Sequence, residues 1–194
     1  MKPYKIITDT SCDLPISMLE KLQVAFVSFY VSFDQTNYQK ELIDITPETF
    51  YNKINTEHLF PKTSLPSVQD YIDVMEPFLK EGLDIYCMCL TQKFSGSYQS
   101  AINAKNILSE TYPNCTIKVM DTACVTGTQG LLVYEACRMR DAGMDMDALE
   151  EKLNLQKETA KINFTVDSLD YLQKGGRIGR ASALAGTIYI SSPS

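Results

Sequence analysis

The chain has 194 residues, enough for one full domain and part of a second, and its 44% apolar and 22% charged residues are ordinary for a soluble globular protein. The net charge of −6, with lysine and arginine scattered along the chain, argues against nonspecific nucleic-acid binding, which needs a surface that neutralises phosphates. No stretch approaches the ~20 apolar residues of a membrane span, and residues 1–5 contain no apolar signal segment, so we expect a cytoplasmic protein.

The expected elements alternate along the chain between short apolar runs, typical of strands, and longer amphipathic runs, typical of helices. The strands are expected at residues 5–8, 24–33, 83–90, 116–120 and 161–166. The helices are expected at residues 15–22, 47–54, 67–79, 97–109, 127–140 and 147–158. Asp13 and Thr46 are the expected N-caps of the first two helices, and Asp147 opens the last with the spacing of a capping box.

This alternation predicts an α/β fold with a parallel sheet, right-handed crossovers and helices on both faces of the sheet. The runs at 83–90 and 116–120 are almost continuously apolar, as expected for strands that are covered on both faces. We expect an α/β domain at residues 1–160. Residues 161–194 would be the incomplete start of a second α/β domain, since so short a segment cannot fold alone.

The cysteines and the histidine give no sign of a metal site. None of the six cysteines forms a C-x-x-C pair, and the chain has one histidine, His58. We therefore predict that the cysteines are small core residues of a reduced protein, and we expect neither metal nor cofactor. Asp9 and Asp121, which end two expected strands, could act as paired carboxylates or metal ligands, but such residues more often accept hydrogen bonds from turn N–H groups.

Polar turns follow several expected strands, where ligands bind in parallel sheets. Ser95 and Gly96 lie directly before a helix, so their hydroxyl and N–H groups point where the helix dipole favours an anion, although Ser95 could simply cap that helix. Ser67 with Asp70 has the pattern of an N-cap, whereas Thr63 lies outside this cap and on its own would be a turn residue.

Two other features bear on the chemistry of the chain. Arg177 lies among glycines in a segment that lacks the spacing of a phosphate-binding loop, so it is either an exposed cation for an acidic partner or part of a surface turn. The sequence contains no G-x-S-x-G elbow, and His58 lies in a polar stretch from which it would not reach Ser95 as a base.

Five segments together resemble the DegV family. They are residues 7–15 (ITDTSCDLP), 63–67 (TSLPS), 95–101 (SGSYQSA), 121–122 (DT) and 169–179 (LDYLQKGGRIG), and they occur in the order of the family's motifs. Each motif is weak alone, but five in order are jointly specific.

The resemblance implies a non-catalytic, two-domain α/β protein that encloses a long-chain fatty acid and presents its carboxylate to a separate, ATP-using fatty acid kinase. By motif, the hydroxyls of Thr63 and Ser95 would bind the carboxylate, with the Gly96 N–H nearby and Arg177 near the head group or on the kinase-facing surface. Family members typically continue well beyond the last residue here and supply a histidine that His58 does not match, so we expect a truncated chain with half of the lipid enclosure.

The sequence leaves two other functions open. A serine hydrolase or acyltransferase would use Ser95 as its nucleophile. A binder of a phosphorylated metabolite, or a kinase subunit, would hold a phosphate at the same helix N-terminus.

Overall fold

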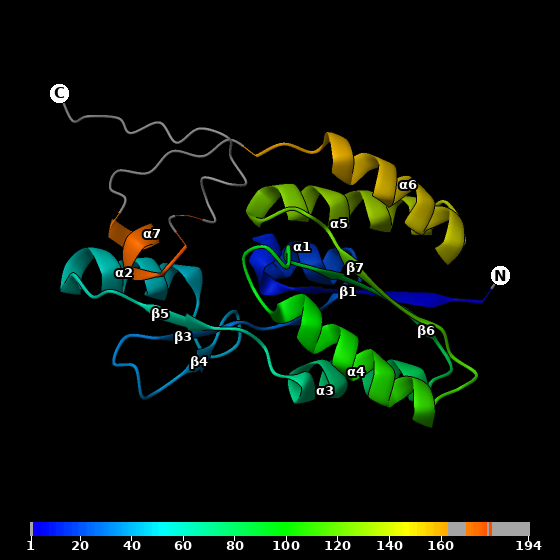
Figure 1. Cartoon of the computed structure of the whole chain (residues 1–194), viewed down its shortest axis with the longest axis horizontal. Coiled ribbons are helices and arrows are strands. Elements are labelled where there is room, and N and C mark those ends of the chain that lie inside the picture. The colour runs from blue at the N-terminus through cyan, green and yellow to red at the C-terminus, as the bar shows by residue number, and fades with distance from the viewer. Residues whose placement is uncertain (1, 163–169, 178, 180–194) are drawn as a thin grey trace.

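The computed structural model describes residues 2–162, 170–177 and 179, and its centre is a parallel sheet (Figure 1). The four strands are β1 (Tyr4–Asp9), β2 (Ala25–Val27), β6 (Asp84–Cys89) and β7 (Ile117–Asp121), in the order β2-β1-β6-β7. Every neighbouring pair is parallel, with Tyr4 opposite Asp84 and Ile85 opposite Ile117. The α/β class and the expected strands at 5–8, 83–90 and 116–120 are thus confirmed.

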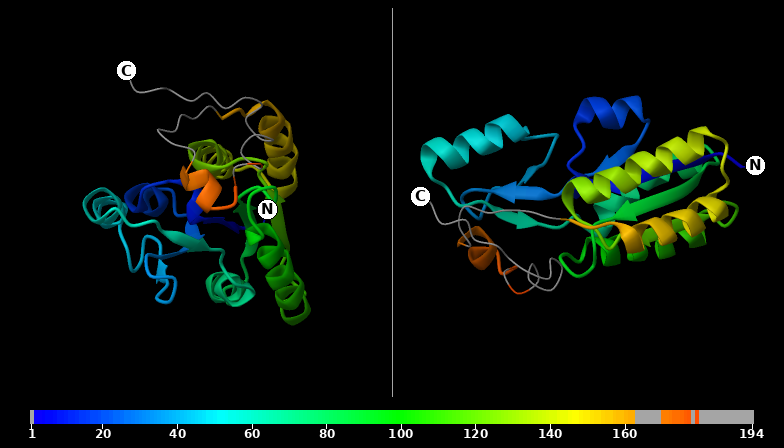
Figure 2. Two further views of the ribbon diagram at one scale, coloured as in Figure 1. Left: turned by 60° about the vertical axis from the view of Figure 1, so that its left-hand side comes forward. Right: turned by 90° about the horizontal axis from the view of Figure 1, so that it is seen from above.

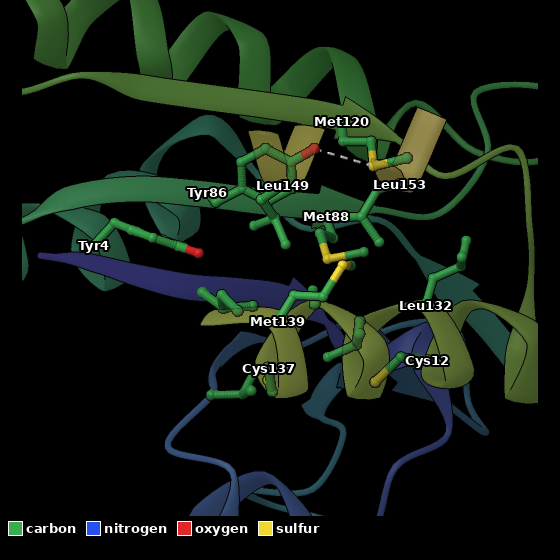
Figure 3. Packing of buried hydrophobic residues seen from close by; sticks show 14 of the residues in the cluster. Tyr4, Cys12, Tyr86, Met88, Met120, Leu132, Cys137, Met139, Leu149 and Leu153 are labelled. Atoms are coloured by element: carbon green, nitrogen blue, oxygen red, sulfur yellow. Dashed lines mark hydrogen bonds between the residues drawn. The ribbon is translucent and has the colours of Figure 1, made fainter. Parts of the chain in front are cut away.

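Helices cover both faces of this sheet, as Figures 1 and 2 show. The helices α3 (Val68–Lys80) and α4 (Ser97–Thr111) pack on one face, and α1 (Ile16–Lys21), α5 (Thr126–Asp141) and α6 (Met146–Thr159) lie on the other. Successive side chains of a strand point to opposite faces. Tyr86 and Met88 therefore pack with Met139 and Leu149 (Figure 3), whereas Cys87 belongs to the core under α3 and α4.

The cysteines are small members of this core. Cys12, Cys87, Cys89, Cys124 and Cys137 are buried, Cys115 is half-buried, and none of the six is in a disulfide. This agrees with the predicted role of the cysteines as compact apolar residues.

The expected strand at residues 24–33 is wrong, because the chain changes sheets within it. Residues of β3 (Tyr30–Ser32) leave the parallel sheet and form a second, antiparallel sheet with β4 (Gln39–Lys40) and β5 (Lys62–Ser64), in the order β4-β3-β5. The break lies at Phe29, whose N–H donates to Thr10 Oγ1 at 3.0 Å and whose carbonyl accepts from Glu41 N at 2.9 Å. These tertiary hydrogen bonds end the pairing with β1.

Two of the expected helix caps are confirmed and two are wrong. Thr46 caps α2 (Pro47–Glu57), and Ser67 forms a capping box with Asp70, both as expected. Asp13 is not an N-cap, because it adopts a left-handed conformation that ends the short 3-10 turn η1 (Thr10–Cys12). Nor does Asp147 cap α6: Asp145 does, accepting hydrogen bonds from two N–H groups of the first turn.

Little of the expected second domain can be compared with the structure. Residues 161 and 162 are not in a strand, and residues 163–166 of the expected fifth strand lie outside the described residues. The described part of this region contains a short helix, α7 (Asp170–Lys174). The domain boundary at residue 160 therefore stays a prediction.

Replacing each of two glycines of α5 by alanine should change the stability of the protein in opposite directions. A Cβ at Gly130 would lie 2.5 Å from the backbone oxygen of Cys12, whereas one at Gly127 would meet nothing within 4 Å. We expect Gly130→Ala to lower the free energy of unfolding by about 1–3 kcal/mol, because the helix must move away from η1. Gly127→Ala should raise it by about 0.5–1 kcal/mol through helix propensity. Urea midpoints of both variants measure this, and equal effects would contradict the close packing of α5 on η1.

Asp70 links α3 to the second sheet and should make the fold sensitive to acid. Burial disfavours its charge, but hydrogen bonds from Ser67, Tyr30 and Lys40 outweigh that cost and hold the pKa of Asp70 at about 2, below the ordinary 3.8. Because the pKa of Asp70 is lower in the folded protein than in the unfolded chain, its ionised carboxylate stabilises the fold. This stabilisation is fully present at pH values above the ordinary pKa of 3.8 and is lost as the pH falls towards 2.

We therefore expect Asp70→Asn to lower the free energy of unfolding at neutral pH by about 2 kcal/mol and to flatten its decline between about pH 4 and pH 2. Denaturant unfolding across that range measures the effect. Asp73→Asn, which removes an exposed carboxylate from the same helix, is the control, and an Asp70 variant with an unchanged acid slope would disprove the role of this residue.

Candidate ligand-binding site

A cavity of about 610 Å³ lies between the carboxyl end of β1, the second sheet and α2. Its wall is mainly apolar and includes Leu14, Phe29, Val31, Ile45 and Phe50. Its volume is within the range of about 300–1,000 Å³ that is typical of small-molecule sites. A cavity with such a wall can bury a long apolar ligand.

Thr63 contributes one of the cavity's polar groups. It lies in β5 opposite Val31 of β3, so it is a strand residue and not the turn residue that the sequence suggested. Its side chain is exposed and faces the cavity, and no group in the described part of the chain pairs with its hydroxyl. Thr63 therefore has a hydroxyl free to donate to a ligand.

Ser95 and Gly96 lie at the N-terminus of α4, as predicted. Gly96 is the N-cap residue, and the half-buried Ser95 accepts a hydrogen bond from Ser97 N at 3.2 Å. Ser95 thus stabilises the start of α4, as the alternative interpretation of Ser95 as a helix cap predicted. It does so only by accepting a hydrogen bond on its hydroxyl oxygen. No acceptor among the described residues takes the Ser95 hydroxyl proton or the Gly96 N–H.

The structure brings the two predicted segments close together. A Cβ at Gly96 would lie 3.4 Å from Leu65 Cδ2, so the N-terminus of α4 contacts the segment that immediately follows β5. The φ of −79° at Gly96 suits any residue, and the contact with Leu65 would be an ordinary one. Neither Ser95 nor Gly96 belongs to the cavity wall itself, so the two segments meet beside the cavity and only Thr63 lines it.

Arg177 lies after α7 with an exposed side chain that donates to the Gly175 carbonyl. The helix α7 contacts the start of β5: Lys62 Nζ donates to the Lys174 carbonyl at 3.4 Å, and Lys174 Nζ lies 3.3 Å from the centre of the Phe60 ring. Arg177 therefore lies on an exposed turn that follows α7, and α7 contacts Lys62, the neighbour of Thr63.

Asp9 and Asp121 accept hydrogen bonds from backbone N–H groups, as the commoner interpretation predicted. Asp121 accepts from Ala123 N at 2.8 Å. Asp9 is completely buried and accepts from Leu90 N at 3.0 Å and from the Ser97 hydroxyl at 3.0 Å. Burial raises the pKa of Asp9, and these hydrogen bonds oppose that effect. Asp9 thereby anchors the first residue of α4, a link that no sequence spacing revealed.

The remaining residues limit the chemistry of the site. Within residues 2–162, 170–177 and 179, no group of three His, Cys, Asp or Glu side chains could hold a metal ion, and no helix is long and apolar enough to cross a membrane. His58 is exposed at the C-terminal end of α2 and makes no hydrogen bond with Ser95. Among the described residues, no base is hydrogen-bonded to Ser95 in the way a nucleophilic serine requires.

Sequence reasoning missed a second polar part of the cavity wall. Thr10 and Glu41 both line the cavity, and Thr10 Oγ1 donates to Glu41 Oε2 at 2.5 Å. Burial raises the pKa of Glu41, the Thr10 hydrogen bond opposes this shift, and the charges of Asp13 and Asp9 add to it. A lone glutamate in a polar loop carries no sequence signal of such a position.

Comparison with known proteins agrees with this architecture. The model of the family described as "Uncharacterised protein, DegV family" matches residues 3–189. A DegV domain-containing protein of Clostridium perfringens is 34% identical over the whole chain, which covers 66% of that protein. The chain thus spans slightly less than two thirds of the length of this curated relative.

Two solved structures have the same fold. A stearic acid-binding protein from Eubacterium ventriosum is 44% identical with a TM-score of 0.86, over 95% of this chain and 64% of that one. A DegV family protein from Thermus thermophilus, described by its fatty acid binding, is 29% identical with a TM-score of 0.79, over 96% of this chain and 64% of that one.

Proposed function

Because the chain belongs to the DegV family, we propose that it binds a long-chain fatty acid without catalysing a reaction. One observation carries the proposal. Three donors in two adjoining segments, the hydroxyls of Thr63 and Ser95 and the Gly96 N–H, have no acceptor among the described residues, and Thr63 lines an apolar cavity. A fatty acid would supply a carboxylate that accepts hydrogen bonds from the three donors and an apolar chain that fills the cavity.

The three donors would hold the carboxylate. A carboxylate that leaves water must be hydrogen-bonded, or it is protonated or excluded. Each hydrogen bond to a charged group contributes roughly 1.5–3 kcal/mol. The 15-residue helix α4 adds the positive end of its dipole at Gly96. These contributions can offset the desolvation of the head group.

The acyl chain would occupy the cavity beside Thr63. Burial of each methylene contributes about 0.8 kcal/mol before entropic costs. The part of the cavity wall formed by Phe29, Val31 and Phe50 presents the surface that such a chain needs. Affinity in this proposal therefore comes mainly from the tail, and orientation comes from the three donors.

The proposed physiological role is to present the bound carboxylate to a separate fatty acid kinase in the cytoplasm. The six unpaired cysteines suit a reducing compartment. Arg177 would lie near the head group or on the surface that faces the kinase, and its exposed guanidinium supports either position. Both the kinase and this use of Arg177 rest on the family.

Mass spectrometry of lipid extracted from natively purified protein tests the proposed function. We expect about one fatty acid for each protein chain, together with displacement of a fluorescent fatty acid by stearate. A phosphate ester should not compete for this site. Protein that neither contains fatty acid nor binds it when added would contradict the proposal, and displacement by phosphate esters alone would support a metabolite binder instead.

A further inference from the structure

The cavity that we assign to the acyl chain has a carboxylate in its wall. Glu41 is half-buried, and its backbone is fixed by hydrogen bonds from its N–H to the Phe29 carbonyl at 2.9 Å and from the Ser28 hydroxyl to its own carbonyl at 2.7 Å. The side chain is therefore held at the cavity by its backbone. A hydrocarbon chain packed against it would strip water from a polar group.

The hydrogen-bonding capacity around Glu41 is only partly used. Thr10 accepts from Phe29 N and gives its single hydroxyl proton to Glu41 Oε2. Among residues 2–162, 170–177 and 179, no group donates to the other oxygen, Oε1. Thr10 has no second proton to offer, so Oε1 must accept from water or from a ligand in the cavity.

We propose that Glu41, oriented by Thr10, is a subsite for a hydroxyl group carried along the acyl chain, so that the preferred ligand is a hydroxylated long-chain fatty acid. This inference rests on the proposed function and specifies its ligand. A hydroxyl can donate to an ionised Glu41 and can also accept from a protonated one. A second carboxylate is disfavoured, because Asp13 also lines the cavity and would add to the repulsion from Glu41.

The sheet indicates where along the chain the hydroxyl would lie. Thr63 is opposite Val31, and Phe29, whose carbonyl accepts from Glu41 N, lies two residues before Val31. At a rise of about 3.3 Å per residue, this separation is roughly 7 Å. The hydroxyl would thus be several carbons from the carboxylate and not on the adjacent carbon.

Binding of three ligands to the purified protein tests this subsite: stearate, a mid-chain hydroxystearate and alpha-hydroxystearate. We expect wild-type protein to bind the mid-chain hydroxystearate roughly tenfold more tightly than stearate, from one hydrogen bond to a charged group. Alpha-hydroxystearate should show no such gain. Glu41→Met, which is similar in size but apolar, should reverse the preference, whereas Glu41→Gln keeps an acceptor and should retain part of it.

The outcomes separate this inference from the proposed function. Wild-type protein that binds stearate at least as tightly as the mid-chain hydroxystearate would overturn the subsite and leave fatty acid binding intact. A preference that survives in Glu41→Met would also overturn it. Protein that binds none of the three ligands would overturn both proposals. The wild-type comparison does not depend on how well any variant folds.

Discussion

Replacing Thr63 and Ser95 together by alanine should lower the affinity for a long-chain fatty acid by at least about a hundredfold, because two hydrogen bonds to the carboxylate are lost. Each single replacement should cost roughly tenfold. Neither hydroxyl proton is used within the described chain, so the loss should appear in binding more than in folding. Titration with a fluorescent fatty acid, alongside thermal unfolding of the empty protein, measures both quantities.

Ser64→Ala is the matched control for this experiment. Ser64 is the neighbour of Thr63 in β5 and is also exposed, but it does not line the cavity, and alternate strand residues point to opposite faces. The affinity of the Ser64→Ala variant for the fatty acid should equal that of the wild-type protein. A double variant of Thr63 and Ser95 that retains wild-type affinity would show that the carboxylate is bound elsewhere.

Asp9→Ala should destabilise the fold strongly, lowering the free energy of unfolding by about 3–5 kcal/mol. The carboxylate accepts from Leu90 N, from the hydroxyls of Ser11 and Ser97, and from the Gln129 amide, all at the centre of the fold. Alanine leaves the buried Leu90 N–H without its acceptor and removes one acceptor from each of Ser11, Ser97 and Gln129. Chemical denaturation measures the loss.

Asp121→Ala is the comparison for Asp9, because both residues end strands of the same parallel sheet. Asp121 is only half-buried, and its shortest hydrogen bond is to the nearby Ala123 N, so its loss should cost about 0.5–1 kcal/mol. Similar losses in the two variants would show that burial of the Asp9 network contributes little. Because Asp9 binds the Ser97 hydroxyl, a variant that folds should also position Ser95 and Gly96 less precisely.

The parallel sheet was predictable because its strands are buried on both faces. Such burial produces continuous apolar runs, as in β6, where every residue is buried. The run at residues 24–33 has the same composition, yet it forms two strands in two sheets. The difference arises from Thr10 and Glu41, which are far from Phe29 in sequence and contact it only in the folded chain. The residue pattern within positions 24–33 therefore could not reveal these contacts.

The candidate site was predictable to a similar degree. Ser95 and Gly96 precede a helix that periodicity locates well, so their position followed from the sequence. Thr63 lies in a strand of three exposed polar residues, which has no apolar alternation to reveal it, and only the family motif singled it out. Glu41 had neither a motif nor a pattern, because its importance depends on a cavity whose walls come from several elements.

The order of the strands also bears on how the protein folds during synthesis. Every described residue that lines the cavity lies at or before position 63, whereas β6, which pairs with β1 on the side opposite β2, lies some 80 residues beyond β1. A nascent chain that has emerged only as far as β5 thus contains all of the described cavity wall but not β6, the central strand next to β1. Closing so long a loop is slow, so the apolar wall should stay open to chaperones until β6 leaves the ribosome.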